Sequence, residues 1–234
     1  FLMDSHVLDK IASQEAWHPL VRTLQRCARQ VRERGDLSYV VRTCADVVRV
    51  QCEQRFLVYH YADVPVAWRA LHTDAILLGG VATLAMQEPT DVEARIRDLD
   101  VALIVSGAPD READVHMLLR ALQAYIPHDD SVLPRLVPDH IPLTQTNAAR
   151  TVDEYVEAPS LSTFLHRCPH PTCPYGAPFV VRGFARDWPA MSRWRDPSDL
   201  CRRAGPGRVV PVEKGLSYTD EAWGQGIVPW SDFL

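Results

Sequence analysis

The sequence lacks a hydrophobic run long enough to span a bilayer. Its longest strongly apolar stretch, Ala75–Ala85, is about half of the ~20 residues that a membrane helix needs. We therefore expect a buried core helix there and no membrane anchor. An excess of one charge is missing as well, because 25 Lys and Arg face 30 Asp and Glu, for a net charge of -5. Without a basic stripe that would follow a phosphate backbone, we expect no direct nucleic-acid binding.

Glycine and cysteine are too scarce for a collagen-like chain or a small disulfide scaffold, at 11 and 6 of 234 residues. We find no secretory signal before the cysteines, and a chain of this length can bury a core without bridges. Reduced thiols in a nuclear or cytoplasmic protein are therefore expected. A Gly-rich phosphate loop, a nucleophile elbow and a His-Glu-x-x-His motif are also absent. The residues alone identify no catalytic set.

The first half of the chain has the spacing of amphipathic helices, with apolar residues three and four positions apart. Ser38 is expected to cap the second helix, and the third has an apolar middle that predicts burial on all sides. Five helices are expected, beginning near Pro19, Ser38, Pro65, Val92 and Val115. Residues 1–126 are thus predicted to form an all-α domain.

The composition changes after residue 126. Residues 127–157 are rich in proline and polar side chains, which is typical of a linker or an irregular segment. Two short β-type runs follow, at Pro178–Gly183 and Arg208–Glu213, with a helical piece near 197–203 between them. The expected fold class is therefore α+β, with helices first and the beginning of a mixed β domain after them.

Several residues have side chains that bind metals. The densest group could form a zinc module, but tetrahedral sites usually draw ligands from two separate elements. We therefore favour a surface loop and keep zinc as a minor alternative. The group consists of His166, Cys168, His170 and Cys173.

Two His-x-Asp pairs match part of the facial triad of non-haem iron oxygenases. His72 and Asp74 fall in a predicted helix, where residues two apart point to nearly opposite faces, so we do not expect them to share an ion. His128 and Asp130 fall in the linker segment without a third ligand, and we interpret that match as chance. The sequence therefore predicts no metal site and no catalytic residue in this chain.

Residues 158–234 contain four blocks in a fixed order, and Phe233 closes the segment. The blocks are Pro159–Phe164, Ala177–Gly183 leading into Asp187–Trp194, Val209–Gly215, and Tyr218–Gln225. In order and spacing they resemble the opening of the JmjC oxygenases, in particular the branch that contains JmjC-domain protein five, also called lysine demethylase eight.

The resemblance implies a double-stranded β-helix (a cupin or jelly roll) that binds Fe(II) and 2-oxoglutarate and uses O2 to modify a protein or peptide. The implied reactions are arginyl hydroxylation and histone lysine demethylation, so a histone or another arginine-containing protein is the implied partner. By position, Tyr218 corresponds to the family tyrosine that helps to hold the 2-oxoglutarate carboxylate. Trp188 and Glu213 are weaker candidates for shaping the substrate pocket.

The chain departs from the family pattern at its end. The family's His-x-Asp pair, its distal His and its 2-oxoglutarate Lys all follow the position of Phe233, and none of them is in this sequence. A facial triad needs two His and one carboxylate. We therefore expect residues 158–234 to be the N-terminal part of a JmjC domain, inactive and without cofactors as this fragment. The alternative is a non-catalytic helical interaction module with a JmjC-derived remnant.

Overall fold

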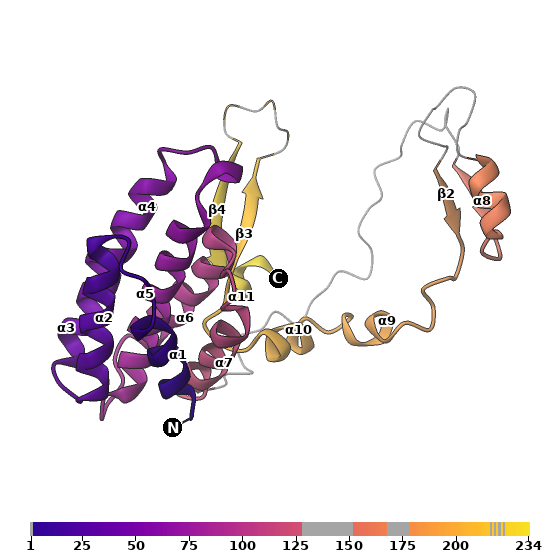
Figure 1. Ribbon diagram of the computed structural model, residues 1–234. Helices are drawn as coiled ribbons and strands as arrows, with labels where there is room; N and C mark the ends of the chain where they lie inside the picture. Colours follow the sequence, from indigo (N-terminus) through magenta and orange to yellow (C-terminus); the bar gives the residue numbers. More distant parts are fainter. Residues whose placement is uncertain are drawn as a thin grey trace. The chain divides into compact units, whose positions relative to one another are not determined.

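A computed structural model describes residues 2–127, 152–167, 178–215, 217, 219, 221 and 223–234 (Figure 1). Contacts divide the chain into two compact units. The first, which we call the helical unit, combines residues 1–130 with residues 201–234. The second, the middle unit, comprises residues 131–200. The last part of the JmjC-like segment therefore packs with the N-terminal helices.

Most of the described helical unit is α-helix, interrupted by two π-helical segments and one short 3-10 turn. The helices α3, η1 and α4 follow one another without a break, and so do α6 and η3. In chain order, the elements are α1 (Leu2–Ala12), α2 (Pro19–Arg32), α3 (Leu37–Arg42), η1 (Thr43–Arg49), α4 (Val50–Phe56), η2 (Tyr61–Asp63), α5 (Val66–Ala85), α6 (Val92–Val101), η3 (Ala102–Ser106) and α7 (Glu112–Gln123).

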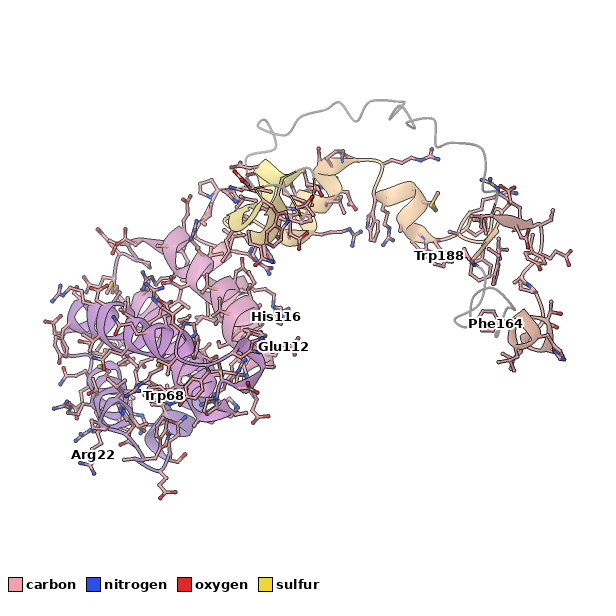
Figure 2. All side chains as sticks on the ribbon, turned by 90° about the horizontal axis from the view of Figure 1, so that it is seen from above. Arg22, Trp68, Glu112, His116, Phe164 and Trp188 are labelled. Atoms are coloured by element: carbon pink, nitrogen blue, oxygen red, sulfur yellow. The ribbon has the colours of Figure 1, made fainter. Side chains whose placement is uncertain are left out.

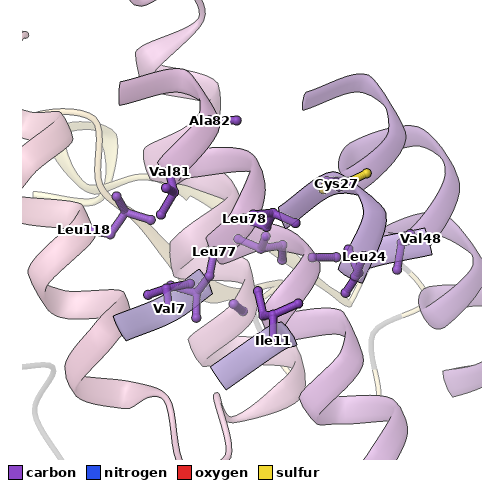
Figure 3. Close-up of a cluster of buried hydrophobic side chains, with 14 of the residues drawn as sticks. Val7, Ile11, Leu24, Cys27, Val48, Leu77, Leu78, Val81, Ala82 and Leu118 are labelled. Atoms are coloured by element: carbon purple, nitrogen blue, oxygen red, sulfur yellow. The ribbon is translucent and has the colours of Figure 1, made fainter. Parts of the chain in front are cut away.

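Helix α5 forms the centre of the helical unit, and it is buried without interruption from Leu71 to Thr83. Side chains of α1, α2, η1 and α7 gather around it, including Ile11, Leu24 and Leu118 (Figure 3). A Cβ atom on Gly80 would lie 2.6 Å from Cδ2 of Leu118, so this glycine allows α7 to approach α5 closely. The predicted core helix is confirmed. None of the described helices is long and apolar enough to cross a membrane.

The helix starts agree with the sequence in part. Pro19 occupies the first turn of α2, as predicted. The second helix is capped by Asp36 and not by Ser38, because the Asp36 carboxylate accepts a 2.8 Å hydrogen bond from the Tyr39 N–H. Helix α1 was not predicted. Its register is set by burial of Val7, Leu8 and Ile11 in the common core.

The described strands form two separate pairs. In the helical unit, β3 (Val209–Lys214) and β4 (Gly224–Pro229) make an antiparallel hairpin, followed by α11 (Trp230–Phe233). In the middle unit, β1 (Asp153–Tyr155) pairs in parallel with β2 (Phe179–Val181). The remaining helices are α8 (Leu161–Arg167), α9 (Pro189–Arg193) and α10 (Pro197–Ala204). The chain is thus helix-rich with a few short strands, which do not by themselves establish a jelly roll.

The described cysteines are all free thiols. They are Cys27, Cys44, Cys52 and Cys201. Burial raises the pKa of Cys52 to about 12, so this thiol stays protonated at neutral pH.

Leu77→Ala tests the central position of α5. Leu77 is fully buried, so its truncation leaves a cavity and should lower the free energy of unfolding by about 2–5 kcal/mol in urea denaturation. The control is Leu57→Ala, because Leu57 is 88% exposed and its loss should cost less than about 0.5 kcal/mol. Equal effects of the two substitutions would contradict this description of the core.

Candidate functional site

The middle unit brings the first two JmjC-like blocks together. Phe164 of α8 and Tyr155 of β1 both pack edge-on against Phe179 of β2, with ring centroids 6.1 and 5.5 Å apart. The backbone N–H of Arg182 donates a 2.8 Å hydrogen bond to the carbonyl of Tyr155, which extends the parallel pair. Aromatic contacts and strand pairing therefore join residues that lie on either side of the segment 168–177.

An open groove of about 600 Å³ lies beside these rings. Its described lining side chains are all apolar, and none of them is titratable. They belong to Ala158, Pro159, Leu161, Phe164, Phe179, Val181, Phe184 and Ala185. Such a surface can bind apolar side chains, and these described residues offer no group for acid–base chemistry.

Trp188 lies in the middle unit, directly before α9, and its side chain is 56% exposed (Figure 2). Its ring centroid is 6.2 Å from that of Phe184, so Trp188 adjoins the apolar groove. It also lines a second open groove that includes Asp187 and Arg195. A role of Trp188 in shaping a pocket stays a prediction.

The other predicted site residues have different surroundings. Glu213 is an exposed residue of β3 and lies opposite Gln225 in the hairpin. It belongs to the helical unit, whereas Trp188 belongs to the middle unit. Tyr218, the predicted 2-oxoglutarate ligand, lies outside the described residues.

The possible metal ligands named from the sequence form no metal site among the residues that the structure describes. In α8, His166 contacts the carbonyl oxygen of Ser162 through Nδ1, at 2.7 Å. Within the described ranges, no three His, Cys, Asp or Glu side chains are grouped so that they could hold an ion. No set of these described residues is therefore suited to the Fe(II) that the resemblance implies. Outside the described residues lie His128, Asp130, Cys168, His170 and Cys173.

His72 and Asp74 contact different elements, as their spacing on a helix predicts. Nδ1 of His72 lies 3.1 Å from Oγ of Ser106 in η3, and Nε2 lies 3.4 Å from Oε1 of Glu53 in α4. The Asp74 carboxylate instead accepts a 2.8 Å hydrogen bond from Nε of Arg111, at the start of α7. The two side chains therefore belong to separate buried polar clusters on α5.

The environments of these two clusters shift carboxyl pKa values in opposite directions. The hydrogen bond from His72 lowers the pKa of Glu53, and the Arg49 guanidinium at 2.8 Å adds to this effect. Because an ionised carboxylate only accepts hydrogen bonds, Nε2 of His72 is the donor. Burial raises the pKa of Asp74 even though Arg111 lies beside it. Both clusters satisfy polar groups inside the helical core, which is a structural role.

A buried carboxylate connects the helices to the JmjC-like hairpin. Asp100 of α6 is 2% exposed. Its two oxygens accept hydrogen bonds from Nε of Arg208 at 2.8 and 2.9 Å, and one also accepts from the Val209 N–H at 2.9 Å. This ion pair holds the first residue of β3 against α6.

A second polar contact supports the same junction. Nε2 of Gln123, the last residue of α7, donates to the carbonyl oxygens of Ala204 and Pro206 at 3.0 and 3.1 Å. Sequence reasoning missed both contacts. A signal existed for Asp100, because it lies four residues after Ile96 and one after Leu99, on the buried stripe of α6. A carboxylate at such a position requires a buried partner.

Comparisons with known proteins connect part of the chain to the JmjC demethylases. Lysine-specific demethylase 8 of Danio rerio is 35% identical over 57 residues, which are 24% of this chain and 14% of that protein. The protein of the same name from Xenopus tropicalis is 33% identical over 57 residues, 24% of this chain and 12% of its own length. Lysine-specific demethylase JMJ30 of Arabidopsis thaliana is 39% identical over 59 residues, which are 25% of this chain and 14% of that protein.

The matched residues are only part of this chain and only part of each relative. They span about a seventh of the length of these curated relatives. No family model matches the chain, and no solved structure matches it. A region of this chain is thus related to JmjC lysine demethylases, and the similarity supports that class without distinguishing a branch.

Asp100→Ala tests the junction between α6 and β3. The substitution leaves the Arg208 guanidinium without its counter-ion and the Val209 N–H without its acceptor, so the free energy of unfolding should fall by about 3 kcal/mol. Hydrogen exchange should also become faster at Val209. The control is Glu93→Gln, an exposed carboxylate on the same helix, which should leave both measurements unchanged. Unchanged exchange at Val209 in Asp100→Ala would contradict the role of the ion pair.

Glu53→Gln tests the cluster around His72. The pKa of Glu53 is lower in the folded chain than its ordinary value of 4.5. Its contribution to stability is therefore present above about pH 4.5 and is lost as the pH falls through the folded pKa. Urea denaturation between about pH 6 and pH 3 should show a smaller acid-side loss of stability for Glu53→Gln than for the native chain. Glu15→Gln, at an exposed residue, should follow the native profile; an equal acid-side loss in Glu53→Gln would argue against the cluster.

Proposed function

We propose that residues 158–234 are the N-terminal part of an Fe(II)- and 2-oxoglutarate-dependent JmjC oxygenase that hydroxylates or demethylates a protein side chain. The observation that carries the proposal is the similarity of 33–39% over 57–59 residues to lysine-specific demethylases from two vertebrates and a plant. The order of the four sequence blocks supports it. The proposed substrate is a histone or another arginine-containing protein, and the proposed location is the nucleus or the cytoplasm.

Within this proposal, the middle unit and the β3–β4 hairpin would have different roles. The middle unit would contribute an apolar groove next to Trp188, suited to packing against apolar parts of a peptide or of the remaining domain. The hairpin would contribute Glu213, and it is anchored to the helices through Asp100. Tyr218 would hold the 2-oxoglutarate carboxylate. Fe(II) would supply the activation of O2, and none of the described residues is assigned to it.

The alternative is a non-catalytic interaction module, and one observation favours it. The apolar groove contains Leu161 and Phe184, which are 72% and 63% exposed. Exposed apolar surface of this kind is characteristic of a binding face. A binding function alone would explain the groove without any chemistry.

The first experiment reads the transcript beyond the codon for Leu234. The oxygenase proposal predicts a continuing frame with a His-x-Asp pair, then a Lys and a second His. The longer polypeptide should convert 2-oxoglutarate to succinate in the presence of Fe(II) and histone or arginine-containing peptides. The 234-residue chain should show no conversion above the level without protein.

The oxygenase proposal and the proposed inactivity of this chain would be overturned by different results. A stop codon at that position, or a longer polypeptide without Fe(II)-dependent succinate formation, would reject the oxygenase and leave the interaction module. Succinate formation by the 234-residue chain alone would keep the oxygenase and reject the proposed inactivity of this chain.

A further inference from the structure

Helix α2 presents a row of arginines to solvent, although the chain as a whole is acidic. Arg22, Arg26 and Arg29 are exposed, while Leu24 and Cys27 on the opposite face are buried in the core. Positions 22, 26 and 29 are spaced by four and three residues, so they share one face of the helix. Figure 2 shows Arg22 at the outer edge of the helical unit. We call these three residues the arginine row.

The arginine row is not neutralised by the described part of its own chain. Helix α2 contains no acidic residue. Arg32, one turn further on, pairs with Asp9 and is therefore not part of the row. By contrast, no described carboxylate forms an ion pair with any arginine of the row; the one described polar contact is between Arg26 and the hydroxyl of Thr23, at 3.3 Å.

The arginine row borders a hollow with a lining that suits an anion. An open depression of about 430 Å³ lies along this face of α2, and none of its described lining residues is acidic. Its lining consists of Pro19, Arg22, Thr23, Gln25, Arg26 and Arg29. Planar guanidinium groups match carboxylates with two parallel hydrogen bonds, and three of them converge on one surface here.

The dimensions of the row fit an extended peptide. At a rise of about 1.5 Å per residue, Arg26 and Arg29 lie about 6 and 10.5 Å beyond Arg22 along the axis. Alternate side chains of an extended segment are about 6.6 Å apart. Acidic residues at two alternate positions would therefore meet Arg22 and Arg26, and a third, about 13 Å along, would lie about 3 Å beyond the Arg29 position, within reach of its long side chain. Nucleic acid fits less well, because three charges on a chain of net charge -5 fall short of the 6–10 phosphate contacts typical of a stable complex.

We propose that the arginine row on α2 is a docking surface for an acidic, extended peptide segment of a partner protein. This proposal does not rest on the oxygenase function, because it concerns a face of the N-terminal helices and no residue of the JmjC-like segment. It also adds a partner of opposite charge to the basic histone substrates proposed above.

The test measures binding of a fluorescein-labelled hexaglutamate peptide to the 234-residue chain by fluorescence anisotropy. The variant Arg22→Gln/Arg26→Gln/Arg29→Gln removes the row, and glutamine retains helix propensity. The matched control Arg42→Gln/Arg97→Gln/Arg120→Gln removes the same number of exposed charges from α3, α6 and α7. The row variant should bind at least about tenfold more weakly, and the control should stay within about twofold.

Three outcomes would overturn the proposal. The first is equal weakening by both triple variants, which would indicate a response to net charge alone. The second is no detectable binding of hexaglutamate at about 0.02 M ionic strength, where screening is weak. The third is tighter binding of a labelled single-stranded oligonucleotide of equal charge, which would assign the row to nucleic acid. Unchanged helical circular dichroism of the row variant ensures that the comparison concerns folded protein.

Discussion

The burial of α5 from Leu71 to Thr83 is the constraint on which the helical unit depends. A helical stretch without a solvent face must be surrounded by other elements, and α1, α2, η1 and α7 supply the surrounding side chains. The same burial encloses the polar side chains of His72 and Asp74. Because unpaired polar groups in a core are costly, each requires a partner from a neighbouring element. Glu53, Ser106 and Arg111 meet that requirement.

A second buried charge extends this organisation to the C-terminal part of the chain. Asp100 sits on the apolar stripe of α6 and pairs with Arg208, which is 108 positions away in the sequence. The pair sets where β3 begins relative to the helices. The compact unit therefore combines N-terminal helices with the end of the JmjC-like segment, so these helices act as a support for the first long strand.

The two surfaces to which we assign proposed roles differ in chemistry. The middle unit has an apolar groove bordered by aromatic rings, and helix α2 has a row of exposed arginines that pair with no described carboxylate. The former relates to the part of the chain that resembles JmjC enzymes, whereas the latter lies on the N-terminal helices. Partial similarity to lysine-specific demethylases supports an enzyme class for one region. This similarity provides no information on the arginine row of α2.

The sequence by itself determined the helical first half, the buried middle of α5, the start of α2 at Pro19 and the divergence of His72 from Asp74. These features follow from local spacing, since apolar periodicity and the geometry of a helix act over a few residues. It also carried the JmjC resemblance, although the roles of Trp188, Glu213 and Tyr218 stay predictions. Only the tertiary structure decided which elements pack together: α1 in the core, Arg208 on Asp100, and the contact of Phe164 with Phe179. Such pairings depend on the approach of residues that are distant in the chain, and the packing of the whole unit selects among the partners that local pattern leaves open.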